Sequence, residues 1–70
     1  MIEVFKTDIH RASEASWVAL ALKSSYKLKH VSFDLEDCDR ILRVESEKID
    51  ADQIVAKLTG LGFQCSILPD

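Results

Sequence analysis

The stretch that decides the fold is HVSFDLEDCDRILRVE, residues 30–45. Its first half has the apolar Val31 and Phe33 at alternate positions, and its second half repeats the pattern with Leu42 and Val44. Alternation with a period of two is typical of a strand with one buried face. A short, mostly acidic segment separates the halves. The stretch is therefore predicted to be a hairpin in which Phe33 faces Leu42 and Val31 faces Val44.

A strand and a helix are predicted before the hairpin. Residues 2–6 alternate, and we expect Ile2 and Val4 to face the core and Phe5 to face outward. Residues 10–26 contain no glycine or proline and are rich in alanine and leucine, which favours a helix. Its expected buried stripe consists of Ala15, Val18, Ala19 and Leu22.

A second helix and a last strand are predicted after the hairpin. Asp50 is a suitable N-cap, and Gln53 stands three residues later in the capping-box position. Gly62 can adopt the left-handed conformation that ends a helix. The alternating segment 63–68 follows at once, so we expect a strand there with Cys65 directed at the core.

The predicted order of elements is β-α-β-β-α-β, which defines a ferredoxin-like α+β sandwich. Right-handed crossovers would place both helices on one face of a four-stranded antiparallel sheet with the order 4-1-3-2. Residues 1–70 are expected to form a single domain, because a chain of 70 residues can build only one core. The expected core includes Val4, Val18, Leu22, Phe33, Leu42, Val44, Val55, Leu58 and Ile67.

The composition argues against several classes of function. A net charge of −3 with only nine Lys and Arg argues against nucleic-acid binding. The longest apolar run, Trp17–Leu22, is far too short for a membrane span, and without a basic leader we expect a cytoplasmic protein. Two cysteines are too few for a disulfide framework, so both are expected to be free thiols. The sequence has no Gly-rich phosphate loop, and an enzyme is not expected.

The chain resembles the heavy-metal-associated domain of copper chaperones and metal-transporting ATPases. The resemblance is carried by the first strand running directly into a helix, by the alternating hairpin, and by the helix ending LTGLGF, residues 58–63. It covers nearly all of the chain and implies the same ferredoxin-like fold.

The motif that defines that family, Met-x-Cys-x-x-Cys before the first helix, is missing. With Thr7 in the methionine position, Ile9 and Ala12 occupy the two thiol positions. In an alignment shifted by one residue, His10 and Ser13 occupy them. Because monovalent copper requires soft thiolate ligands, the resemblance implies the family's fold but not its metal-transfer activity.

Two residues could form a metal site of another kind. His10 and Cys38 are expected at the same end of the sheet, where Asp37 and Asp39 could add oxygen ligands. The simpler interpretation makes His10 a residue of the first helical turn and Cys38 a loop residue, so we expect no cofactor. A metal ion held near His10 and Cys38 is the alternative.

The sheet face away from the helices is the second candidate site. We expect Phe5, Ile41, Leu68 and Arg43 on this face, where they could bind a protein partner or form a weak homodimer. The function expected from these observations is a non-catalytic accessory or interaction domain that has lost the thiol site. A metal-binding protein is the first alternative, and a regulatory domain that binds a small molecule at a dimer seam is the second.

Overall fold

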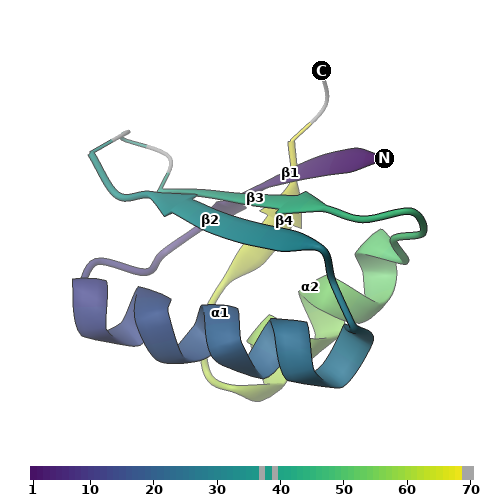
Figure 1. Cartoon of the computed structure of the whole chain (residues 1–70). Coiled ribbons are helices and arrows are strands. Elements are labelled where there is room, and N and C mark those ends of the chain that lie inside the picture. The colour runs from purple at the N-terminus through teal and green to yellow at the C-terminus, as the bar shows by residue number, and fades with distance from the viewer. Residues whose placement is uncertain (37, 39, 69–70) are drawn as a thin grey trace.

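The computed structural model describes residues 1–36, 38 and 40–68. The elements follow in the order β1 (Ile2–Thr7), α1 (Ala12–Tyr26), β2 (His30–Asp34), β3 (Ile41–Glu45), α2 (Ala51–Gly60) and β4 (Cys65–Ile67). The strands form one antiparallel sheet in the order β2-β3-β1-β4, and both helices cover the same face of it (Figure 1). The chain is a ferredoxin-like α+β sandwich, as predicted.

The hairpin has the predicted register. Phe33 pairs with Leu42 and Val31 pairs with Val44. Leu42 and Val44 are fully buried because β3 lies in the middle of the sheet, whereas Val31 and Phe33 on the edge strand are half-buried against the same core. A shift of one residue would turn both apolar sets toward solvent, which is why the pattern specifies the pairing so well.

The prediction for the faces of β1 was wrong. Phe5 is fully buried and stands opposite Leu42 on the helix-covered face. Ile2 is 46% exposed, and Val4, predicted as a core residue, is half-buried on the opposite face. The reason is that both faces of this strand carry apolar residues, and burying the large phenyl ring removes more apolar area from water than burying a valine.

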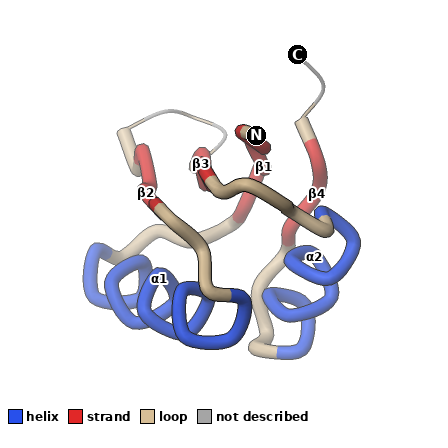
Figure 2. The backbone as a smooth tube through the Cα atoms, turned by 45° about the vertical axis from the view of Figure 1, so that its right-hand side comes forward, coloured by secondary structure: helices blue, strands red, loops and turns tan. Residues whose placement is uncertain are grey.

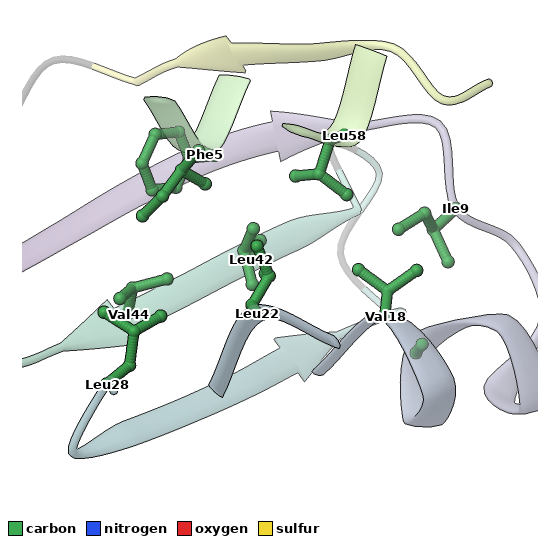
Figure 3. Packing of buried hydrophobic residues seen from close by; sticks show 10 residues of the cluster. Phe5, Ile9, Val18, Leu22, Leu28, Leu42, Val44 and Leu58 are labelled. Atoms are coloured by element: carbon green, nitrogen blue, oxygen red, sulfur yellow. The ribbon is translucent and has the colours of Figure 1, made fainter. Parts of the chain in front are cut away.

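Three further core assignments differ from the prediction. Ile67 lies opposite Phe5 but is 45% exposed, because β4 is an edge strand whose outer flank has no neighbouring strand in the described chain. Ile9 and Leu28, which precede α1 and β2, are buried although neither belongs to a helix or strand. Side chains of Phe5, Ile9, Leu28 and Leu42 point into the single core in Figure 3.

Both helix ends follow from local chemistry. The Asp50 side chain accepts a hydrogen bond from the Gln53 N–H at 3.3 Å, which confirms the predicted N-cap of α2. At its other end, Gly62 has a φ of +97° and the Phe63 N–H donates to the Leu58 carbonyl at 3.0 Å. The first helix begins at Ala12, two residues later than expected.

The helices form one layer under the sheet. Figure 2 shows α1 beneath β2 and α2 beneath β4, and each helix contacts that edge strand. Trp17 packs on Phe63 with ring centroids 5.8 Å apart, so it lies at the helix flank as expected. No helix of the described residues is both long enough and apolar enough to cross a membrane.

The two faces of β1 can be tested by a pair of substitutions. Phe5→Ala should lower the free energy of unfolding by about 3–5 kcal/mol, because it empties a fully buried site. Val4→Ala should cost less than about 1 kcal/mol, because Val4 is only half-buried on the open face. Equilibrium unfolding in urea measures both changes. Equal effects, or a larger effect at Val4, would contradict the assignment of the faces.

Candidate functional site

The residues that flank three of the loops lie at one end of the sheet. Thr7 at the end of β1 pairs with Cys65 at the start of β4, and its N–H donates to the Arg40 carbonyl just before β3. The β1–α1 loop, the start of β3 and the turn before β4 therefore lie at the same end of the sheet. This is the end of the fold at which the resemblance to heavy-metal-associated domains would place a metal.

The β1–α1 loop is held there by packing and hydrogen bonds. The buried Thr7 hydroxyl donates to the Arg40 carbonyl at 2.6 Å and accepts from the Ile9 N–H at 3.3 Å. Ile9, which occupies one of the two thiol positions in the first alignment, is fully buried in the core. An apolar anchor thus stands where a thiolate ligand would have to be exposed to a metal.

A second contact connects this loop to the last strand. The Gln64 N–H donates to the Asp8 carboxylate at 2.8 Å. Charge-assisted hydrogen bonds of this kind are stronger than neutral ones, so the contact fixes the spacing between the loop and β4. Asp8 is thereby engaged in structure at the point where the loop enters α1.

The proposed metal ligands His10 and Cys38 are both exposed. No group of three or more His, Cys, Asp and Glu side chains within residues 1–36, 38 and 40–68 is placed to hold a metal ion. The added ligands Asp37 and Asp39 lie outside the described residues. Within the described part of the chain, His10 and Cys38 therefore do not belong to a ligand cluster.

The hairpin loop is organised by its own polar groups. Asp34 accepts a hydrogen bond from the Glu36 N–H at 3.2 Å, and the Arg40 guanidinium donates to the Leu35 carbonyl. Arg40 itself has a φ of +50°, in the left-handed region, as the chain turns into β3. These contacts bring the chain back into register before Ile41.

Cys65 differs from Cys38 in environment. Its side chain is half-buried against the core, and this burial, together with the negative charge of Asp8, raises the pKa of the thiol to about 11. A thiol with such a pKa is protonated at neutral pH and is a weak nucleophile and a weak metal ligand. Cys38 is a free and exposed thiol.

The open face of the sheet carries three of the four predicted interaction residues. Parity along the paired strands places Ile41, Arg43 and Leu68 on this face, and Phe5 on the other. Strand β1 contributes Ile2 and Val4 in place of Phe5. We call the set Ile2, Val4, Ile41, Arg43 and Leu68 the open-face patch.

A groove between α1 and β2 was not predicted from the sequence. It has a volume of about 310 Å³ and is lined by Ala12, Ala15, Ser16, Ala19, Val31, Ser32, Phe33 and Leu35. The signal for it was the spacing of small residues along α1, which leaves one flank of the helix without bulk. The small residues of α1 form one wall of the groove, and the edge strand β2 forms the other.

The chain was compared with protein-family models, with curated proteins and with solved structures. None of these comparisons gives a significant match. The function is therefore inferred from the residues and their arrangement.

The environments of the two thiols predict different reactivity. In the Cys65→Ala variant, Cys38 should react with iodoacetamide at pH 7 faster than Cys65 does when it is the only thiol, because Cys38 is exposed. In the Cys38→Ser variant, Cys65 should react slowly, since at pH 7 roughly one thiol in ten thousand is ionised when the pKa is about 11. Its rate should rise about tenfold per pH unit up to pH 10. Equal rates at pH 7, measured by mass spectrometry, would contradict this arrangement.

The absence of a ligand cluster among the described residues predicts weak metal binding. Calorimetric titration with Zn²⁺, and competition titration with Cu⁺, should show affinities no better than micromolar. The His10→Ala and Cys38→Ser variants should behave like the wild type. Submicromolar one-to-one binding that is lost in either variant would instead establish the alternative site at His10 and Cys38.

Proposed function

We propose that the chain is a non-catalytic protein-interaction domain whose open-face patch binds a partner protein. The observation that carries this proposal is the uncovered sheet face. Both helices lie on the other side of the sheet (Figure 2). The register places apolar residues of β1 and β3, and Leu68 just after β4, on the open side. An apolar surface of this kind on a small domain is typical of interaction sites.

The apolar members of the patch are neighbours. The Leu68 N–H donates to the Val4 carbonyl at 2.9 Å, so these two residues form a cross-strand pair on the open face. Ile41 lies opposite Lys6, diagonally across the sheet from Val4, and Ile2 is two residues before Val4 on the same face. Ile2, Val4 and Leu68 are thus adjacent on this face, and Ile41 stands diagonally across from Val4.

Arg43 defines the chemistry of the partner. It stands between Val4 on β1 and Ser32 on β2, and its side chain is exposed beside the apolar residues. Arginine at the margin of an apolar patch is characteristic of protein interfaces, where its guanidinium binds carboxylates in bidentate fashion. We therefore expect a partner that presents apolar side chains with a carboxylate placed opposite Arg43.

We also propose that the chain is a divergent heavy-metal-associated domain that kept the fold and lost the thiol pair. Its fold and the short loop that connects β1 to α1 support this proposal. The burial of Ile9 supports the loss of the metal role, because the loop now contributes to the core instead of presenting ligands. The interaction surface would then be the part of the molecule that carries the function.

Affinity capture with matched variants tests the interaction role. Wild type, Ile41→Lys, Arg43→Glu and Ser24→Lys proteins are immobilised and exposed to lysate of the source cell, and bound proteins are quantified by mass spectrometry. Ser24 is exposed on α1, away from the open face, and serves as the control. A true partner should be retained by wild type and Ser24→Lys and lost by both open-face variants.

The captured partner must then bind in purified form. We expect one-to-one binding that weakens at least about tenfold in Ile41→Lys, since a buried charge replaces an apolar contact. Circular dichroism checks that the variants are folded. Partners that bind all four proteins equally, or no partner at all, would contradict the proposal.

A further inference from the structure

The outer edge of β2 has main-chain groups that no strand of the described chain pairs with. The Thr7 N–H bonds to the Arg40 carbonyl and the Ser46 N–H bonds to the Met1 carbonyl, so even-numbered residues of β3 bond to β1. In an antiparallel sheet, successive residues of a strand direct their main-chain N–H and carbonyl groups to opposite sides, so the odd-numbered residues of β3 bond to β2. The residues opposite them are His30, Ser32 and Asp34.

It follows that Val31 and Phe33 direct their N–H and carbonyl groups away from the sheet. Their side chains meanwhile line the groove beside α1. An edge of this kind is a template for another extended strand, and natural edge strands are commonly protected by proline, charged side chains, bulges or a covering segment. Strand β2 is a regular five-residue strand without proline.

The charges at the two ends of β2 are complementary when two copies of the strand lie antiparallel. Exposed Lys27 and Lys29 precede the strand, and exposed Asp34 and Glu36 stand at its end. Antiparallel pairing of two β2 strands would bring the basic start of each copy to the acidic end of the other. Complementary charges of this kind favour one orientation of association and disfavour the parallel one.

We propose that a second copy of the chain pairs with β2 across a two-fold axis at Ser32. In this register Val31 of each copy faces Phe33 of the other, so all four outward N–H and carbonyl groups of each strand are used. His30 then lies opposite Asp34 of the second copy on the open face. The two sheets become one continuous eight-stranded sheet.

The groove accommodates the helices of such a dimer. Strands lie about 4.8 Å apart, so a four-stranded sheet is about 19 Å wide, close to the width of two helices packed about 8–10 Å apart. Joining two copies at β2 therefore brings their α1 helices, each of which contacts its own β2, against one another beneath the joined edge. Approach this close requires small side chains, and α1 presents Ala12, Ala15, Ser16 and Ala19 there.

An exposed apolar residue lies at the margin of this contact. Leu20 is 69% exposed and stands one helical turn after Ser16, on the same side of α1. The second α1 helix would cover it. The dimer uses a surface different from the open-face patch, and it would double that patch by placing two copies of it on one continuous sheet.

Sedimentation equilibrium tests the dimer. The wild type should shift from 7.9 kDa toward twice that mass between low micromolar and near-millimolar concentration. Ser16→Arg places a long charged side chain between the helices and should abolish the shift. Ser24→Arg, the same change at an exposed position of α1 outside the groove, and Ile41→Lys on the open face should leave it intact.

A cross-link tests the register. In a Cys38→Ser, Cys65→Ala background, Ser32→Cys should give a disulfide-linked dimer in diamide, because paired residues at the axis are close enough for a disulfide. His30→Cys, which faces Asp34 of the second copy, should not. A wild type that stays monomeric, a dimer dissociated by Ile41→Lys but not by Ser16→Arg, or cross-linking at His30 but not at Ser32 would each overturn the proposal.

Discussion

Two short helices can cover only one face of a four-stranded sheet, and this limit decides where every strand residue of the chain lies. The covered face receives Phe5, Leu42 and Val44, which are fully buried between the sheet and the helices (Figure 3). The other face must remain accessible. Because the strands have period-two alternation, burying Phe5 turns Ile2 and Val4 outward. The apolar character of the open face is thus a consequence of how the core is filled.

The need to fill the core also determines the structure of the loop before α1. A 70-residue chain has few residues with which to fill a core, and Ile9 from this loop is part of the core. The Thr7 hydroxyl and the Asp8 carboxylate hold the surrounding backbone against Arg40 and Gln64. In a metal-binding version of this fold the loop would present soft ligands. Here the loop contributes Ile9 to the core, and for this reason we propose that the function lies on the sheet surface and its edge.

The hairpin could be predicted from the sequence because Val31, Phe33, Leu42 and Val44 alternate with polar residues, so only one register buries them. The buried face of β1 could not be predicted, since Ile2, Val4 and Phe5 place apolar groups on both faces. Only the pairing of Phe5 with Leu42 decides which face is buried. Burial of Ile9 and Leu28 and the groove beside α1 depend on tertiary contacts that local patterns do not encode. The predicted alternation of residues 41–45 and 63–68 agrees with the structure, so Ile41, Arg43 and Leu68 lie on the open face. The predicted alternation of β1 is shifted by one residue, so Phe5 lies on the opposite face.

The orientation of β1 determines both which residues fill the core and which form the open-face patch. Nuclear Overhauser spectroscopy of the folded protein tests it most directly. We expect cross-peaks from the Phe5 ring to the methyl groups of Leu42 and other core residues, together with cross-peaks between the methyl groups of Val4 and Leu68. Cross-peaks from the Phe5 ring to Ile41 or Leu68, and from Val4 to core methyl groups, would contradict this orientation.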